Sequence, residues 1–554
     1  GEVFPLGAAV RAHLGGEDLE AALVQRLDGE ERLAADLARY LRGEGEIAGG
    51  MERLSIGLVR LIRALAGEAP LVLTIEDLHF AGEATRTVVP MLARGLVESR
   101  LLLCLSARPL EDDDPLLDVL RLEEARRLEL QGLSSSARMA ILHDALGTGD
   151  RHPAQIAELA RKSDGNPYFL LELASACREP DSAPGSDTAD TSVPTTLTTM
   201  LKRRIAALTD DDRELLEAAA CCGYVFDPEL LAEASGRGLI TILKRLGRME
   251  RRGGLVVTAG DAYRFHHHLL QEVLYDALHP RLRKAHHASI GGVLFDRVGG
   301  EEDVDPGLAA QLCLHLFRGG RARDATPYLF LAEGWYRTRC EYAAGLALLE
   351  LALEEEEALP ATERAWTLYQ AGSASIVAGD IGAAETYLLR ACGLAEELGL
   401  DELQARALRS LASAKISRRE HDEGRSLAQA AIDAARRAGD PTTEAHAWLA
   451  LAQDAVFRED AEGARRACAA AAAVAGGLDD VELAASVALH TARAARLAGD
   501  LDTAAREAAR SASMVRACGD RGRVLQAMEV EGSVAYAAGR FADALSITDR
   551  LIEL

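Results

Sequence analysis

Apolar residues between positions 70 and 109 form two short uninterrupted runs, LVLTI at 71–75 and LLLCL at 101–105. Between them, TRTVVPMLARGLVES at 85–99 spaces its apolar residues as a helix does. Short continuous apolar runs are typical of strands that are covered on both faces. We therefore predict strand, helix and strand, with the strands parallel and the crossover right-handed. Pro90 should kink this helix or delay its start.

The segments on either side of this unit predict further helices and one hairpin. Residues 1–68 and 111–178 have helical spacing, whereas 179–193 is rich in Ser, Asp, Pro and Thr without periodicity and is typical of a linker. Residues 194–298 predict helices followed by GLVVTAGDAYRF at 254–265, two β-rich runs around Ala-Gly-Asp. Helices followed by a short hairpin are typical of a winged helix.

The region 299–554 is helical throughout and repeats itself. Loop-like segments occur near residues 340, 380, 420, 460, 500 and 540, a period of about 40 residues. A second series of breaks, LGLDE, AGDPTTE, GGLDDVE and CGDRGR, lies between them. Each repeat is therefore predicted to be two helices, which cannot bury an apolar face alone. We expect a tetratricopeptide-like (TPR-like) superhelical array with a concave surface.

Charge and cysteine content narrow the classes of function. The formal net charge of −25 argues against a nucleic-acid binder as a whole, because phosphate contacts need clustered Lys and Arg. The nine cysteines are scattered, apart from Cys221-Cys222, and have no CxxC spacing, which favours reduced thiols in a cytoplasmic protein. No apolar run approaches the roughly 20 residues that span a bilayer, and no secretory signal opens the chain. The start and the end of the sequence also suggest a fragment.

Polar residues follow both predicted strands. Glu76 and Asp77 come after the first strand, and Ser106, Ala107 and Arg108 follow the second. The carboxyl ends of parallel strands lie on one edge of the sheet, where open α/β sheets bind ligands. Paired carboxylates at such an edge suit a metal-nucleotide site. The alternative is a solvated acid pair that caps the following turn, together with a surface arginine.

Five motifs in a fixed order resemble the signal-transduction ATPases with numerous domains (STAND), including LuxR-type and maltose-activator-type regulators and the ATPase modules of kinases and cyclases. The resemblance runs from about residue 60 to the end. The motifs are EDLHFA at 76–81, SARP at 106–109, LELQGLS at 128–134, GNPYFLLEL at 165–173 and YRFHHHLLQEVLYDAL at 263–278.

The resemblance implies a mostly helical α/β protein. Residues 1–110 would be the carboxyl-terminal part of a P-loop NTPase sheet, followed by a helical lid (111–178), the linker, a winged helix (194–298) and the TPR-like solenoid (299–554).

The same resemblance assigns roles to individual residues. Glu76 and Asp77 would be the Walker B acids, holding Mg²⁺ through its waters and orienting the attacking water. Arg108 would reach the terminal phosphate of ATP. Asn166 and Pro167 would lie against the base, although Pro167 also suits the first turn of any helix. His267 would contact the β-phosphate of ADP, so that the winged helix clamps the resting state.

Several residues depart from the family pattern or have simpler interpretations. Phe80 and Gly82 replace the family's Trp and Asp, and His79 is expected to be structural. A zinc site from His266, His267 and His268 is not expected, because alternate side chains of a strand point apart. No GxxxxGK[ST] and no Gly-Lys pair occur, so the phosphate-binding loop is absent from this sequence through truncation or true loss. We expect weak or no ATP hydrolysis.

Three functional hypotheses remain. In the first, the chain is an ATP/ADP- and Mg-dependent signalling switch. The repeats then sense a protein or small-molecule inducer on the concave face, and a homo-oligomer could form on activation. Its transcriptional or signalling output, and any contact with DNA, would come from a domain outside this chain.

In the second hypothesis, the chain is an inactive repeat scaffold that binds proteins. In the third, the winged helix binds DNA through KRLGRMERR at 244–252, although acids such as Glu214 and Glu229 crowd this unit.

Overall fold

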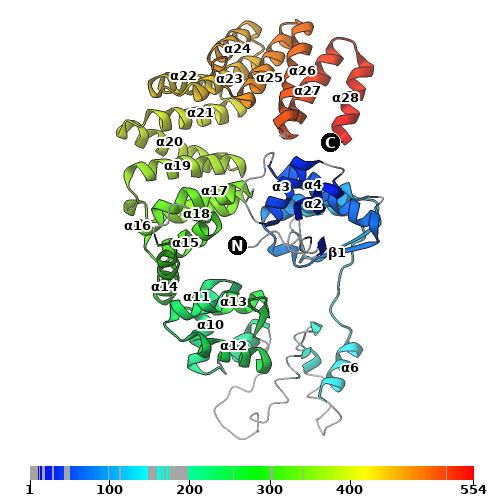
Figure 1. Ribbon diagram of the computed structural model, residues 1–554, viewed down its shortest axis with the longest axis vertical. Helices are drawn as coiled ribbons and strands as arrows, with labels where there is room; N and C mark the ends of the chain where they lie inside the picture. Colours follow the sequence, from blue (N-terminus) through cyan, green and yellow to red (C-terminus); the bar gives the residue numbers. More distant parts are fainter. Residues whose placement is uncertain are drawn as a thin grey trace. The chain divides into compact units, whose positions relative to one another are not determined.

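The structure is a computed structural model, and most of the residues that it describes are helical (Figure 1). The chain divides into two compact units, residues 1–125 with 302–317 and 322–554, and residues 126–301 with 318–321. The described residues are 10, 13–14, 19–27, 30–42, 50–97, 99–110, 114–146, 159–161, 163, 165–167, 170–171, 174, 197–206, 208–253, 255–299, 304–339, 341–518 and 521–553. The predicted linker at 179–193 lies outside them.

The amino-terminal part contains the predicted strand–helix–strand unit. Strands β1 (Leu71–Ile75) and β2 (Leu101–Leu105) are parallel and pair in register from Leu71↔Leu101 to Ile75↔Leu105. The connecting helix α5 (Glu83–Gly95) starts before Pro90 and continues through it, so the proline does not delay its start. Helices α2 (Leu19–Arg26), α3 (Glu31–Arg42) and α4 (Gly50–Glu68) pack with α5 around an apolar core, and η2 (Pro115–Arg121) follows β2.

The prediction that both faces of this sheet are covered is wrong for the described residues. Val72 and Leu102 are paired in register, and their exposed fractions are 64% and 59%. The side chains on the other face belong to the core clusters, so only one face is packed. A continuous apolar run indicates that a strand can be buried on both faces. Whether helices cover the second face of the sheet depends on other parts of the fold.

The second unit contains the predicted hairpin. Strands β4 (Val256–Ala259) and β5 (Ala262–Phe265) are antiparallel around a turn in which Gly260 has φ of 63°, a conformation that favours glycine. Strand β3 (Val225–Phe226) pairs with the other side of β5. The helices of this unit are α6 (Ser135–Leu146), α9 (Leu197–Ala206), α10 (Asp210–Cys222), α11 (Pro228–Ser235), α12 (Leu239–Gly253), α13 (His268–Ala277) and α14 (Pro280–Val298).

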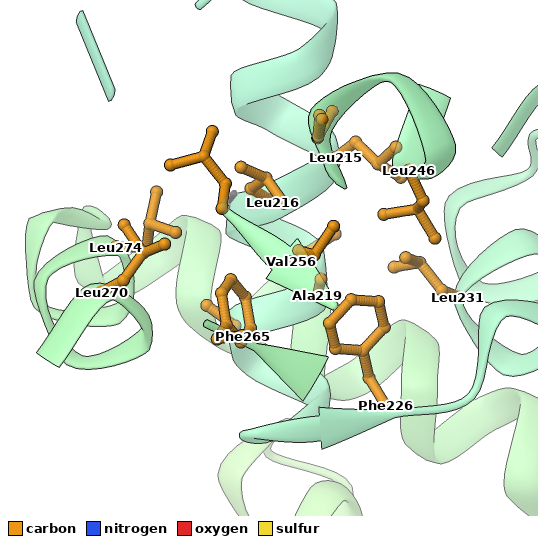
Figure 2. Packing of buried hydrophobic residues seen from close by; sticks show 14 of the residues in the cluster. Leu215, Leu216, Ala219, Phe226, Leu231, Leu246, Val256, Phe265, Leu270 and Leu274 are labelled. Carbon is orange, nitrogen blue, oxygen red and sulfur yellow. The ribbon is translucent and has the colours of Figure 1, made fainter. Parts of the chain in front are cut away.

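One apolar core joins helices α9 to α13 and the small sheet of this unit. Figure 2 shows Phe226 and Phe265 from the strands beside leucines of the surrounding helices, and both phenylalanines are almost fully buried. Their ring centroids are 5.4 Å apart in a tilted arrangement, a favourable geometry for aromatic pairs. The core therefore fixes the hairpin, and with it the start of α13, against α10 and α12.

Helical pairs make up the rest of the chain, as the period predicts. From α20 onward, every second helix begins 40 residues after the one before, at 381, 421, 461, 501 and 541. The helices are α15 (Pro306–Arg318), α16 (Ala322–Ala325), η3 (Thr326–Tyr328), α17 (Leu329–Thr338), α18 (Tyr342–Glu354), η4 (Glu356–Ala358), α19 (Ala361–Val377), α20 (Ile381–Leu398), α21 (Asp401–Ser417), α22 (His421–Ala438), α23 (Pro441–Phe457), α24 (Ala461–Ala475), α25 (Val481–Leu497), α26 (Leu501–Cys518), α27 (Arg521–Ala537) and α28 (Phe541–Glu553).

Local sequence explains why the helices start and stop with this period. The side chains of five aspartates accept a hydrogen bond from a backbone N–H in the first turn of the following helix, which satisfies one of its open donors. Gly399 and Gly439 end α20 and α22 in the left-handed conformation. The array is thus a TPR-like helical solenoid with long helices. The capping aspartates are Asp380, Asp440, Asp460, Asp480 and Asp500.

Candidate functional site

The polar turns after β1 and β2 are joined by hydrogen bonds. The backbone N–H of Asp77 donates to Ser106 Oγ at 3.0 Å, and the N–H of Leu78 donates to the Ser106 carbonyl at 2.9 Å. Asp77 has φ of 54° and ψ of 41°, a left-handed conformation that is uncommon for a residue with a side chain. Glu76, Asp77 and Arg108 are exposed and lie at the same edge of the sheet. This edge, Glu76–Asp77 with Ser106–Arg108, is called the strand-end rim below.

His79 and two further side chains hold the rim in place. His79 Nδ1 accepts from the backbone N–H of Arg108 at 3.4 Å, and its carbonyl accepts from Arg86 Nη2 at 3.0 Å. Arg86 also forms an ion pair with Asp114, whose side chain is only 5% exposed. These contacts agree with the structural role expected for His79. Nothing in the spacing of Arg86 and Asp114 indicates from sequence that a helix and a later turn meet here.

The motifs at 128–134 and 165–173 pack directly against each other. The N–H of Leu133 donates to the carbonyl of Gly165 at 2.8 Å. Gly165 has φ of 79°, a backbone conformation that favours glycine. A Cβ at this position would also lie only 2.8 Å from Gly132 Cα, so a residue with a side chain would clash there. The next two residues, Asn166 and Pro167, are exposed, and the Asn166 carbonyl accepts from the N–H of Leu170. A plain helix start therefore accounts for the local geometry of this turn.

His267 lies at the amino end of α13 as its capping residue. Its Nδ1 accepts a hydrogen bond from the N–H of Leu269 at 3.1 Å. An accepting Nδ1 places the proton of the neutral ring on Nε2. The neighbouring His268 stacks on Tyr224, with ring centroids 3.4 Å apart. His267 and His268 thus have different local environments.

The structure brings some of the predicted site residues together and leaves the rest in another unit. Glu76, Asp77 and Arg108 share the strand-end rim, whereas Asn166, Pro167 and His267 belong to the second unit. The closure of these six residues around one nucleotide stays a prediction.

Among the described residues, no group of three or more His, Cys, Asp or Glu side chains could hold a metal ion directly. Mg²⁺ bound by Glu76 and Asp77 through water is a different arrangement and also stays a prediction.

The repeat array places its first helices side by side. Helices α19, α21, α23, α25 and α27, the first of each pair, contact one another in succession as well as their own partners. We call the surface that they form the first-helix face. Arg493 Nη1 on α25 donates to Gln453 Oε1 on α23 at 3.2 Å, which joins equivalent positions of two repeats on this face.

Charged side chains are also buried between repeats. Asp454, whose side chain is 1% exposed, accepts from His421 Nδ1 at 2.7 Å and pairs with Arg458 Nε at 3.2 Å. Lys415 lies against Glu385 at 2.7 Å and Glu420 at 2.8 Å, and hydrogen bonds to these carboxylates raise the pKa of Lys415. Neither residue was singled out from the sequence, because a charge in a helical repeat ordinarily indicates a solvated face.

Two features agree with the bulk expectations. The described helices include none that is long and apolar enough to cross a bilayer. Cys221, Cys222 and Cys392 are free thiols, and burial raises the pKa of each to about 12. Thiols with such pKa values are poor nucleophiles, which fits packing rather than catalytic roles.

Comparison with known proteins gives distant likenesses. No family model matches the chain. A protein of Rhizobium meliloti (strain 1021), described as uncharacterized, is 26% identical over 357 residues, which is 60% of this chain. The aligned part is 32% of that relative, so the chain spans about a third of the relative's length.

Solved structures are similar to the chain at low identity. A STAND protein with a tetratricopeptide repeat sensor from Pyrococcus horikoshii has 14% identity and a TM-score of 0.38, over 97% of this chain and 82% of its own. Aspartyl phosphate phosphatase F from Bacillus subtilis has 11% identity and a TM-score of 0.38, over 77% and 95%. A Rap protein complexed with competence and sporulation factor has 15% identity and a TM-score of 0.35, over 50% and 71%. Likenesses of this size carry no functional argument.

Proposed function

We propose that the chain is the sensing and switching part of a nucleotide-dependent signalling regulator of the STAND class, in which the repeat array receives an inducer. The observation that carries this proposal is the strand-end rim. Two carboxylates and an arginine follow parallel strands that are in register, and the Asp77–Ser106 hydrogen bond holds the two turns together. Ligands of open α/β sheets bind at this edge.

Each rim residue has a chemical role in this proposal. Glu76 and Asp77 would hold the water shell of a bound Mg²⁺ and orient a water toward ATP, and Arg108 would contact the terminal phosphate. The exposure of all three leaves them accessible to a ligand. The left-handed backbone of Asp77 supports the same interpretation, because uncommon backbone conformations cluster at functional sites.

The second unit supplies the other proposed contacts. Its helices and three-stranded sheet, in the order β3-β5-β4, suit a winged helix. His267 caps α13 through Nδ1, so Nε2 carries the proton and can donate to the β-phosphate of ADP. The exposed turn at Asn166 and Pro167 would lie beside the base. A histidine that binds ADP but not ATP gives the differential contact that a switch requires.

A repeat scaffold without nucleotide is the second candidate. It is favoured by the absence of GxxxxGK[ST] from the sequence, which removes the usual phosphate cradle. Direct DNA binding through α12 has less support, since Arg245 of its basic segment hydrogen-bonds to Asp212 at 2.7 Å and also pairs with Asp211. Those carboxylates neutralise part of the charge that phosphates would need.

Nucleotide titration of the full natural polypeptide separates the two candidates. We expect fluorescent ADP to bind in the presence of Mg²⁺, and Arg108→Ala to weaken binding at least about tenfold, equivalent to about 1.4 kcal/mol. Arg100→Ala is the matched control, because Arg100 is an exposed arginine at the opposite end of β2. His267→Ala should weaken ADP binding more than ATP binding. Absence of nucleotide binding, or equal affinities for all variants, would support the scaffold.

A further inference from the structure

The first-helix face carries a polar cluster that the strand-end rim does not involve. Gln453 on α23 and Arg493 on α25 occupy equivalent positions of successive repeats, 40 residues apart, and their hydrogen bond spans the two helices. His490 lies one turn before Arg493 on the same helix, and His446 on α23 interacts with it electrostatically. We call Gln453, His490 and Arg493 the repeat-face cluster.

Arg493 is a partly buried cation that has no carboxylate partner in the described part of the chain. No Asp or Glu oxygen of the described residues lies within ion-pair distance of it, and among these residues it donates to the neutral amide of Gln453. Burial lowers the pKa of Arg493, and the more distant Glu529 on α27 offsets this in part. A guanidinium has five N–H donors, so one bond to an amide leaves most of its capacity for another acceptor.

His490 gives a second, independent indication that the repeat-face cluster binds a further group. Its Nδ1 has almost no exposure to solvent and no hydrogen-bond partner among the described residues. Burial, together with the nearby cationic Arg493 and His446, lowers the pKa of His490 to about 3, so the ring is neutral at pH 7. A buried polar atom without a partner costs about 1–3 kcal/mol. Such groups in native proteins call for an explanation, and an absent ligand is one.

We propose that the repeat-face cluster binds an acidic side chain of a peptide that lies across the first helices α23 and α25. This inference rests on the proposed role of the array as the receiving part. A carboxylate fits because it is planar and singly charged and accepts paired N–H groups from a guanidinium, while the neutral imidazole can donate a further N–H. The first-helix face continues over α21 and α27, the first helices on either side of α23 and α25.

A polyanion with phosphate groups fits this cluster less well. Phosphate sites in nucleic-acid binders use several cations, and the cluster offers one guanidinium and a neutral ring. The net charge of −25 acts against phosphates and carboxylates alike, so the attraction must come from the single guanidinium of Arg493, which one carboxylate matches in charge and geometry. Charge complementarity therefore favours an acidic peptide.

Fluorescence anisotropy tests the proposal with two labelled probes, a hexaglutamate and a hexaglutamine peptide, both acetylated and amidated. At physiological salt the chain should bind hexaglutamate at least about tenfold more tightly than hexaglutamine, and Arg493→Gln should remove most of that difference. Arg465→Gln is the control, an exposed arginine on α24, the second helix of its pair. Arg493→Lys keeps the charge and should retain part of the binding, which separates lost recognition from lost folding.

The outcomes of this test are distinct. Equal binding of both peptides, or equal effects of Arg493→Gln and Arg465→Gln, would overturn the proposal. Tighter binding of a labelled single-stranded DNA than of hexaglutamate would also overturn it and assign the face to nucleic acid. Nucleotide affinity measured on the same Arg493→Gln sample should match the unaltered protein. The effect of Arg108→Ala on nucleotide binding tests the proposed switch and does not bear on this site.

Discussion

The backbone N–H of Asp77 donates to the hydroxyl of Ser106, although the two residues belong to turns 29 positions apart. This bond closes the carboxyl ends of β1 and β2 into one polar edge and holds Asp77 in its left-handed conformation. The relative positions of Glu76, Asp77 and Arg108 therefore depend on a serine that carries no charge. The rim is a joined structure rather than two independent loop ends.

Removing the Ser106 hydroxyl should loosen the rim. Ser106→Ala leaves the Asp77 N–H without its acceptor, and a neutral hydrogen bond contributes about 0.5–1.5 kcal/mol. We expect the Asp77 amide to exchange with solvent several-fold faster, as measured by hydrogen–deuterium exchange. Ser106→Thr keeps the hydroxyl and serves as the control. Unchanged exchange in the alanine variant would mean that the rim does not depend on this bond.

Helix packing in the repeats depends on a glycine at one contact. A Cβ on Gly424 of α22 would lie 2.6 Å from Ile416 Cγ1 of α21, so Gly424→Ala should overpack the interface at a cost of about 1–3 kcal/mol. Gly393 of α20 is exposed with nothing within 4 Å of the added carbon, and Gly393→Ala should stabilise by up to about 1 kcal/mol. Thermal unfolding should show opposite shifts, and shifts of the same sign would contradict the packing argument.

The buried carboxylate of Asp454 should matter more than an exposed one nearby. Asp454→Asn removes the charge that His421 and Arg458 contact, and a charged hydrogen bond contributes about 1.5–3 kcal/mol. Asp422→Asn is the control, because Asp422 is 95% exposed and pairs with Arg425 on the same helix, where the expected effect is below about 0.5 kcal/mol. Urea unfolding should rank the two variants in this order, and equal midpoints would argue against the buried network.

Stability should fall in mild acid through His490. Its pKa is about 3 in the folded chain against 6.5 for the ordinary group, so the unfolded chain binds the extra proton between these values. The contribution of neutral His490 to the free energy of unfolding is complete above about pH 6.5. This contribution is lost as the pH falls toward 3, by at most about 1.4 kcal/mol per pH unit. Arg493 and His446 act on His490 directly, and Glu529 acts on Arg493.

A variant series isolates this titration. His490→Gln should flatten the dependence of the unfolding midpoint on pH between about 6.5 and 4, relative to the unaltered chain. His143→Gln, at an exposed histidine of α6, should leave the slope unchanged. Parallel slopes for the unaltered chain and the His490 variant would show that His490 is not the group responsible.

The sequence by itself determined the periodic elements of this protein. Capping aspartates such as Asp440 and helix-ending glycines such as Gly439 act within a few residues of themselves, so the 40-residue repeat could be predicted from local rules. The parallel strands and the Ala-Gly-Asp hairpin followed from short apolar runs and one turn signal in the same way. The rim acids could be located because they directly follow a strand.

Only the tertiary structure decided which distant side chains meet and which surfaces are covered. Val72 has the apolar character of a buried residue but is exposed, whereas Asp454 is charged but buried, because burial depends on elements far away in the sequence. The pairing of Gln453 with Arg493 depends on two successive first helices packing side by side. Local periodicity fixes where a helix begins and ends, but the contacts between helices set the environment of each side chain and therefore its chemistry.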